Sequence, residues 1–333
     1  MSQKVPTFSH SQFAHCESGV TSTLFSAYGF KISEPMAFGI TSALTFVYLP
    51  FVKVNNLPLI AYRSLPKSII NTISKVLHVT MEKRSYKSEQ DANEELKSFA
   101  KEGKLVGLQT SVYYLPYFPK DMRFHFNAHN LLVYGMEGEE YLISDPVFEE
   151  TVKCSQEGLT KARFAKGVFA PKGFLYYPKT IPQSVDMHSA IKKAIVKNAK
   201  SMLTPFPFAG VKGMRRLAKK IESLHSETNT RYIKNYLTHI VRMQEEIGTG
   251  GGGFRFLYAA FLEEAKSYGL NAEMLTEASE LIVKSGNTLR EFALYCVEGS
   301  RKLEKLDTQK IASKLVEASE HEEKAFKLLK MLK

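Results

Sequence analysis

Cys16 is the residue in this sequence best suited to act as a nucleophile. It lies in the segment HCESGV (residues 15–20), directly before residues 21–28, which predict a helix that ends at Gly29. A cysteine attacks as its thiolate, and both a helix N-terminus and a nearby imidazole favour that form. The alternative is a structural thiol, because an unpaired cysteine commonly packs as a small buried hydrophobe.

Two predicted strands supply a base for this thiol and a group to orient that base. His129 opens the apolar strand 130–134, and Asp145 closes the next strand, 141–145. If these strands pair as a hairpin, both side chains lie at the same end of the sheet, where Asp145 would orient the imidazole. The order Cys, His, Asp, with the cysteine on an early helix, is that of papain-like enzymes. His125 competes for the base role because it would share a face with His129 on a continuous strand, although residues 126–128 are poorer strand material.

A metal site is the alternative use of the histidines in this region, His10, His15, His125 and His129. The sequence lacks a carboxylate–histidine spacing of the HExxH kind. Its 3 cysteines are too few and too scattered for a four-cysteine zinc site or a disulfide framework. We therefore predict no metal centre, and we expect a reducing, cytoplasmic environment.

The composition is that of an ordinary globular protein. The chain has 333 residues, of which 44% are hydrophobic and 24% are charged, so disordered and collagen-like classes are excluded and two domains are the natural expectation. The first eight residues, MSQKVPTF, carry no basic-then-apolar leader, so we expect no secretory signal. The longest uncharged stretch, residues 35–52, is interrupted by polar residues and proline, which favours a buried helix and strand over a membrane span.

The pattern of predicted elements changes near residue 185. Before it, short apolar runs predict the strands of a mostly antiparallel sheet, at 105–108, 130–134, 141–143 and 174–177, with helices at 64–77 and 91–102. Residues 136–140 (MEGEE) would form a hairpin loop. After residue 185 the strong periodic segments are all helical. Because the Pro-rich segment 177–182 interrupts both patterns, we predict an α+β domain over 1–183 and an all-α helical domain over 184–333.

The distribution of charge predicts an anionic partner. The formal net charge is +11, and residues 187–221 contain nine basic residues and no acidic one. A surface of this kind attracts anions, but aromatic residues are not interleaved with the basic ones and no nucleic-acid-binding motif accompanies them. An acidic protein partner and a merely solvated helix face both stay open, and the candidate docking residues are Arg215, Arg216, Lys219 and Lys220.

Four segments resemble one known family when they are taken together in order. HCESG (15–19), SEPMAFGI (33–40), SVYYLPY (111–117) and HNLLVYGMEGEEYLISDP (129–146) are similar to the N-terminal domain of the butirosin biosynthesis protein H family. TGGGGFRFLYAAFLEEA (249–265) resembles the helical domain that commonly follows it. The resemblance implies a papain-like fold, with Cys16 as nucleophile, His129 as base and Asp145 as its orienter.

The same resemblance implies an activity in secondary-metabolite biosynthesis, such as antibiotic biosynthesis. The namesake of the family is an acyltransferase that moves an aminoacyl group from the phosphopantetheine thioester of an acyl carrier protein to an amine. Phosphopantetheine would then belong to the carrier substrate, and the enzyme itself would bind no cofactor. A hydrolase with the same residues, such as a peptidase, amidase or thioesterase, and a non-catalytic binding protein are the alternatives.

Further residues could bind the substrate or stabilise the intermediate. The backbone N–H of Cys16 would donate to the oxyanion, with Gln12 or His15 as a second donor. Glu34 precedes Pro35 at a predicted helix start, where it would either stabilise the helix or bind an amine. Other candidates are Tyr114, which would line a cleft or pack in the core, and Gly252, Gly253 and Arg255, which would bind an anion or form a plain flexible connection.

Overall fold

The computed structural model describes residues 8–54 and 56–332, and their contacts divide the chain into two units. The sheet unit comprises the described residues up to Ala37 together with Pro66–Val185. The helical unit comprises Phe38–Leu65 together with the described residues from Asp186 onward. The two units therefore do not follow the predicted consecutive division at 183 and 184, because residues 38–65 contact the later helices rather than the sheet.

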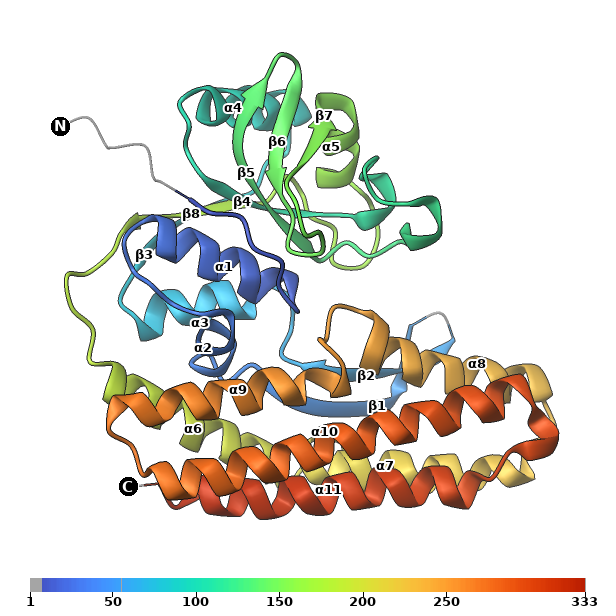
Figure 1. The fold of residues 1–333 in the computed structure, drawn as a ribbon. Helices are drawn as coiled ribbons and strands as arrows, with labels where there is room; N and C mark the ends of the chain where they lie inside the picture. The colour runs from blue at the N-terminus through green and yellow to red at the C-terminus, as the bar shows by residue number, and fades with distance from the viewer. Residues whose placement is uncertain (1–7, 55, 333) are drawn as a thin grey trace. The chain divides into compact units, whose positions relative to one another are not determined.

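The sheet unit is built on a six-stranded sheet in the order β3-β8-β4-β5-β6-β7, in which each neighbouring pair is antiparallel (Figure 1). The strands are β3 (Thr80–Arg84), β4 (Val106–Thr110), β5 (His129–Glu137), β6 (Glu140–Ser144), β7 (Val152–Ser155) and β8 (Leu175–Thr180). The predicted strands correspond to β4, β5, β6 and β8. Only two residues join β5 to β6, and Gly138 adopts the positive φ of 59° that so tight a turn requires.

Helices cover both faces of this sheet (Figure 1). α4 (Glu89–Lys101) and α5 (Gln156–Arg163) pack on one face through an apolar core that includes Leu96, Leu131 and Leu159. α1 (Cys16–Ala27) contacts β5, β4 and β8, and it also contacts α3 (Ser68–Val76). The close approach of Tyr176 to β4 requires glycine at position 107, since a Cβ there would come within 2.4 Å of the tyrosine ring.

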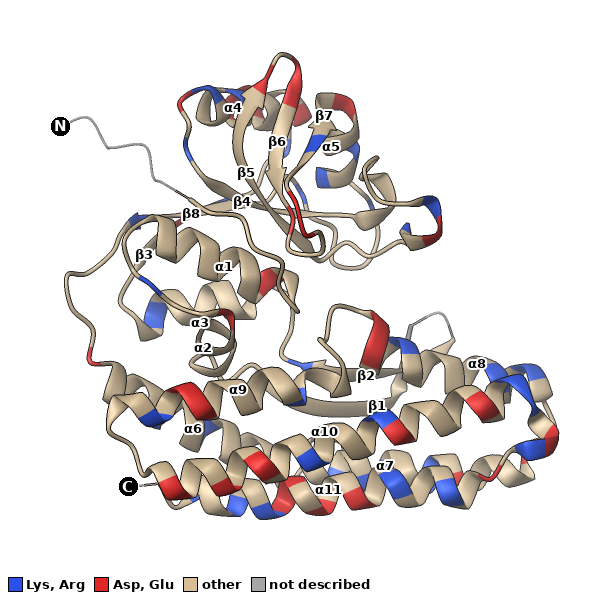
Figure 2. Cartoon of the chain, viewed as in Figure 1, with Lys and Arg blue, Asp and Glu red and all other residues tan. Residues whose placement is uncertain are grey.

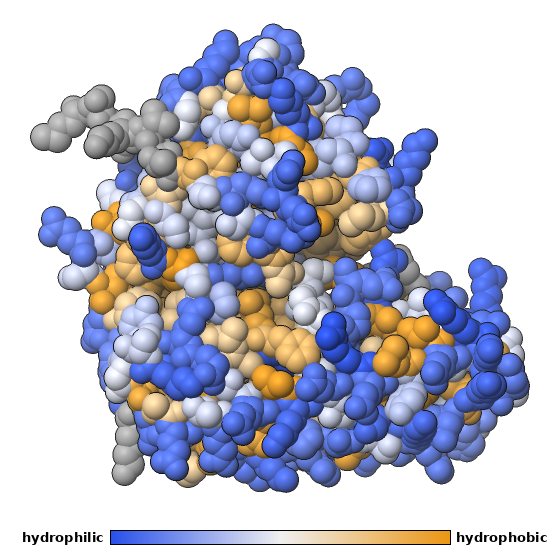
Figure 3. All heavy atoms as spheres, in the orientation of Figure 1, coloured by the Kyte–Doolittle hydropathy of each residue, from blue (hydrophilic) through white to orange (hydrophobic). Residues whose placement is uncertain are grey.

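The helical unit consists of long amphipathic helices and one hairpin. Its helices are α6 (Met187–Met202), α7 (Gly210–Glu222), α8 (Thr230–Val241), α9 (Arg255–Ala265), α10 (Ala272–Arg301) and α11 (Thr308–Lys330). α10 packs against α8, α9 and α11, and it continues without a break through Gly286. On the face seen in Figure 3 the long helices are mostly hydrophilic, as expected when their apolar stripes face one another.

The hairpin of the helical unit pairs β1 (Leu44–Val54) with β2 (Leu57–Arg63). Side chains along β2 alternate between buried and half-buried positions, and β1 contacts α6 and α7. The C-terminal segment is thus all-helical as predicted, but the unit to which it belongs also contains these strands. None of the helices within residues 8–54 and 56–332 combines the length and the apolar character that crossing a bilayer requires.

The α+β fold class predicted from the sequence is confirmed. The sheet is antiparallel, it precedes the helical segment, and the order of cysteine helix, histidine strand and aspartate strand is the expected one. This arrangement places the first residue of α1, the first residue of β5 and the residue after β6 in the same unit, where the candidate site is formed.

Candidate active site

The first turn of α1 is fixed by two buried carboxylates. Glu34 accepts hydrogen bonds from the backbone N–H groups of Ala14 and His15, at 3.0 and 2.7 Å, and from the Ser18 hydroxyl at 3.1 Å. Burial raises the pKa of Glu34, although these three donors counteract the shift. The structure therefore places the Glu34 carboxylate where it holds the segment around Cys16, at the start of a different helix from the one that Glu34 was predicted to begin.

Glu17 holds the same turn from the other side. Its carboxylate accepts the backbone N–H groups of Lys67, Ile69 and Ile70 at 3.0–3.3 Å, at the start of α3. A carboxylate at a helix N-terminus is favoured by the unpaired N–H groups there. The residues on either side of Cys16 are thus tied to the sheet unit, His15 by Glu34 and Glu17 by the start of α3. Sequence reasoning gave Glu17 no role, although its position next to the cysteine was a signal.

His15 is the N-cap residue of α1. Its Nδ1 accepts the backbone N–H of Ser18 at 3.3 Å, so the side chain satisfies one of the N–H groups that a helix start leaves without a partner inside the helix. Cys16 follows as the first helical residue, a position whose backbone N–H has no carbonyl acceptor within its own helix. This is the backbone donor expected for an oxyanion.

The imidazole of His129 links Cys16 to Asp145. Its Nε2 lies 2.7 Å from Asp145 Oδ2, and both side chains are buried. The Cys16 thiol is near enough to the same ring to affect its pKa, and its Sγ lies 4.0 Å from the carbonyl oxygen of Ala128. Burial by itself lowers the pKa of His129, but Asp145 and Cys16 outweigh that effect and raise it to about 10. The ring is therefore an imidazolium at neutral pH, positioned to stabilise a thiolate.

Residues 10–13 lie along residues 144–148, and this contact brings the start of α1 to the end of β6. His10 bonds the Ser144 hydroxyl through Nδ1 at 2.7 Å, and the backbone N–H of Phe13 donates to Pro146 O at 2.9 Å. The side-chain amide of Gln12 donates to Val147 O at 2.9 Å. Gln12 thus joins the two segments.

The other histidines do not converge on one point. His125 lies four residues before β5, is exposed, and stacks on Tyr113 with ring centroids 4.0 Å apart. Tyr114 lies beside both rings and is 36% exposed, so it belongs to a surface cluster and not to the core. His125 therefore lies outside β5 and does not share a strand face with His129.

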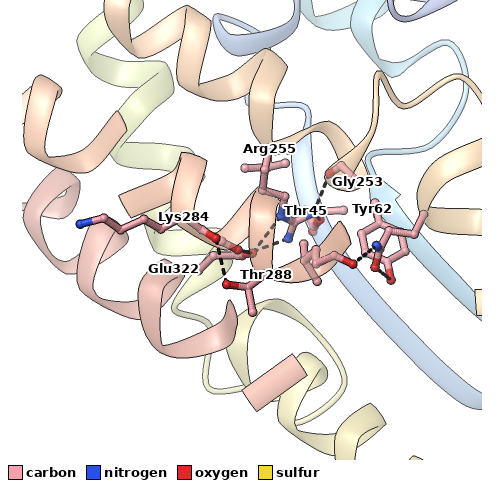
Figure 4. A network of polar contacts seen from close by, with 12 residues as sticks. Thr45, Tyr62, Gly253, Arg255, Lys284, Thr288 and Glu322 are labelled. Atoms are coloured by element: carbon pink, nitrogen blue, oxygen red, sulfur yellow. Dashed lines mark hydrogen bonds and ion pairs between the residues drawn. The ribbon is translucent and has the colours of Figure 1, made fainter. Parts of the chain in front are cut away.

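The glycine loop and Arg255 bind carboxylates of the chain itself. Arg255 is fully buried and pairs with Glu322 through Nε at 2.9 Å and a terminal nitrogen at 3.0 Å (Figure 4). It also donates to Gly253 O at 2.7 Å, and the backbone N–H of Gly252 donates to the carboxylate of Glu245. Sequence reasoning identified anion-binding groups here, but the structure shows that internal carboxylates occupy them, so these residues stabilise the helical unit.

The predicted docking residues differ in how freely they can bind a partner. Arg215 is half-buried and bonds Ser319 and Glu323, whereas Arg216 and Lys219 are exposed. The guanidinium of Arg216 lies 4.3 Å from the ring centroid of Phe208, and Lys220 is half-buried near Tyr232. Basic side chains recur along α7, whereas α11 carries both signs (Figure 2).

Two family profiles match the chain. The family described as butirosin biosynthesis protein H, N-terminal, matches residues 15–146, which contain the three residues that the site brings together. Residues 15–146 of this chain therefore belong to the butirosin biosynthesis protein H N-terminal family. Residues 157–329 belong to the family described as a domain of unknown function, DUF4872, which covers most of the helical segment.

Comparison with curated proteins finds no match for this family member. Among solved structures, a putative C39-like peptidase from Bacillus anthracis aligns at 15% sequence identity with a TM-score of 0.37, over 54% of this chain and 100% of that one. Cys16, His129 and Asp145, which the structure brings together, all lie within the residues that the butirosin biosynthesis protein H N-terminal model matches.

Proposed function

We propose that this protein is a cysteine-dependent acyltransferase that forms amide bonds. It would take an acyl or aminoacyl group from the phosphopantetheine thioester of an acyl carrier protein and pass it, through an acyl-enzyme on Cys16, to a small amine. The observation that carries the proposal is the contact of the Cys16 thiol, at the first position of α1, with an imidazole that Asp145 holds at 2.7 Å. The family supports a biosynthetic substrate.

The first half of the reaction would form the acyl-enzyme. The Cys16 thiolate attacks the thioester carbonyl carbon, and the resulting oxyanion accepts a hydrogen bond from the Cys16 backbone N–H. The carbon–sulfur bond of the donor then breaks, and the His129 imidazolium protonates the departing pantetheine thiolate. The ring is left neutral, the state in which it can act as a base.

The second half would transfer the acyl group. An amine attacks the acyl carbon, neutral His129 removes its proton, and Cys16 leaves as a thiolate beside the regenerated imidazolium. Asp145 keeps the ring in one orientation through both halves, as the third member of a triad does. Transfer prevails over hydrolysis only if the amine is held at the acyl carbon and water is excluded.

For the partner, we propose that an acidic carrier protein docks on the helical unit. Arg216 stacks on Phe208, whose ring centroid lies 5.3 Å from that of Phe51 and 5.5 Å from that of Phe206. Phe51 is 64% exposed and Phe206 is 49% exposed. Exposed aromatic rings beside arginine are typical of residues that dominate protein interfaces. Nearby, Lys212 and Arg215 line a surface pocket of about 430 Å³ together with Lys327 and Lys330.

The experiment that tests the activity separates transfer from hydrolysis. The protein is incubated with acyl- and aminoacyl-pantetheine thioesters, with and without a set of primary amines, and the products are weighed by mass spectrometry. The proposal predicts amide products that need Cys16 and form at the expense of free acid. Free acid as the sole product at every amine concentration would identify a hydrolase instead.

A further inference from the structure

Tyr117 donates a hydrogen bond to the carboxylate that orients His129. Its hydroxyl lies 2.8 Å from Asp145 Oδ2, the same oxygen that lies 2.7 Å from His129 Nε2. The other oxygen, Oδ1, accepts the backbone N–H of Val147 at 3.0 Å. Asp145 is fully buried, so these three donors replace the water that a carboxylate would otherwise require.

The ring of Tyr117 is held by aromatic contacts around the same two residues. It meets Phe148 edge to face with centroids 5.5 Å apart, and Phe148 meets Phe118 at 4.9 Å. Phe118 in turn contacts the His129 ring at 5.6 Å and 90°. The consecutive residues Tyr117 and Phe118 therefore reach the aspartate and the histidine respectively, which fixes both members of the pair from one loop.

We propose that Tyr117 is a positioning residue of this enzyme, which fixes Asp145 and limits how strongly that carboxylate binds the imidazole of His129. The inference rests on the proposed function, because Tyr117 acts through His129 and Asp145, which that function uses in catalysis. Two donors on one oxygen compete for the same electron density, so the phenol weakens the bond to His129 while it prevents the carboxylate from rotating. Without the phenol, the imidazolium would be held more tightly and would be a poorer acid.

The protonation state of Tyr117 is compatible with this role. Burial, and then the negative charge of Asp145, hold the pKa of Tyr117 well above its usual range. The phenol is therefore neutral and donates its proton to the carboxylate. Cys16 and Asp145 are the ionisable groups that interact with the His129 ring.

Tyr117→Phe in the full-length protein is the direct test, because it keeps the ring and its aromatic contacts. The bonded Nε2 proton of His129 should give a far-downfield proton NMR signal, assigned by its loss in His129→Gln. We expect that signal to move further downfield in Tyr117→Phe. In the acyl-transfer assay, kcat should fall about tenfold with KM for the thioester unchanged.

Tyr141→Phe is the matched control. Tyr141 is a buried tyrosine on β6 whose hydroxyl has no hydrogen-bond partner among the described residues, so its removal should leave the signal and kcat unchanged. An unmoved signal in Tyr117→Phe, or the absence of a downfield signal in the unmodified protein, would overturn the inference. The NMR readout needs no acyl donor, so a protein that hydrolyses thioesters, or that transfers nothing, would refute the proposed function without deciding the role of Tyr117.

Discussion

His129 begins β5 and Asp145 follows the end of β6, and their side chains meet at 2.7 Å inside the sheet unit. The antiparallel pairing of these two strands brings the residues to the same end of the sheet. Each depends on the other, since a buried carboxylate needs a cationic partner and a buried imidazolium needs an anionic one.

Asp145→Asn should lower the pKa of His129 from about 10, because the amide keeps the shape of the carboxylate but lacks its charge. The imidazolium would then be lost at lower pH, and the thiolate would lose the cation that stabilises it. The rate of iodoacetamide alkylation of Cys16 at neutral pH, followed by intact mass, measures this change. We expect slower alkylation in Asp145→Asn; an unchanged rate would show that Asp145 does not control the ring.

The stability of the protein should fall between neutral and alkaline pH. The pKa of His129 in the folded protein, about 10, lies above the ordinary value of 6.5. A group with a raised folded pKa contributes stability that is complete below its unfolded pKa and is lost as the pH rises through the folded value. Urea unfolding at a series of pH values between 6.5 and 10 should therefore show a decrease that is smaller in Asp145→Asn. An equal decrease in both proteins would contradict the assignment.

The order of the elements around the site follows from the sequence, whereas the packing that completes the site does not. Short apolar runs bounded by turn residues predict β4, β5, β6 and β8, and the placement of His129 and Asp145 at strand ends follows from them. Residues 10–13 contact residues 144–148 through bonds that span more than a hundred positions, such as His10 to Ser144. No local periodicity encodes such contacts, and the same is true of the bond from Tyr117 to Asp145.

The helical unit shows a second limit of sequence reasoning. Residues 38–65 precede all six strands of the sheet but contact helices that begin after residue 185, so a division made by composition along the chain separates them from those helices. The glycine loop before α9 has the features of an anion site, and the anions prove to be Glu245 and Glu322 of the same chain. A sequence shows that a group can bind an anion, but it does not show which anion reaches it.

Glu34→Gln should slow acyl transfer through kcat. The neutral amide accepts the N–H groups of Ala14 and His15 less strongly, so the start of α1 would hold Cys16 less rigidly, with a loss of about 1–3 kcal/mol in unfolding free energy. Steady-state kinetics with varied amine separates this role from amine binding. A rise in KM for the amine with kcat unchanged would instead assign Glu34 to the acceptor.

Arg255→Met should destabilise the protein by about 3–5 kcal/mol, because it leaves Glu322 buried without its cation. Both side chains are fully buried. Glu322→Gln should cost a similar amount, and the double variant should lose much less than the sum of the two. Urea unfolding of the three variants measures the coupling. Additive losses would show that the pair is not an energetic unit.

Reversal of charge at Arg216 and Lys219 to glutamate should raise KM for an acyl-carrier-protein thioester at least tenfold while KM for the matching pantetheine thioester stays constant. Like charges at an interface slow encounter and weaken binding, and the effect decreases as salt screens it. The control is the same reversal at Lys101 and Lys120, exposed lysines of the sheet unit. Equal changes in KM for both donors would rule out this docking surface. So would equal changes in KM from reversal at Arg216 and Lys219 and from reversal at Lys101 and Lys120.

Intact-mass spectrometry of the protein after brief exposure to acyl- and aminoacyl-pantetheine thioesters, with no amine present, tests the central claim most directly. We predict a mass increase equal to one acyl group, located on Cys16 by peptide mapping, absent in Cys16→Ala and strongly reduced in His129→Ala. An acyl adduct on a residue other than Cys16 would contradict the account. So would acyl transfer to an amine, in the complete assay, that persists in Cys16→Ala.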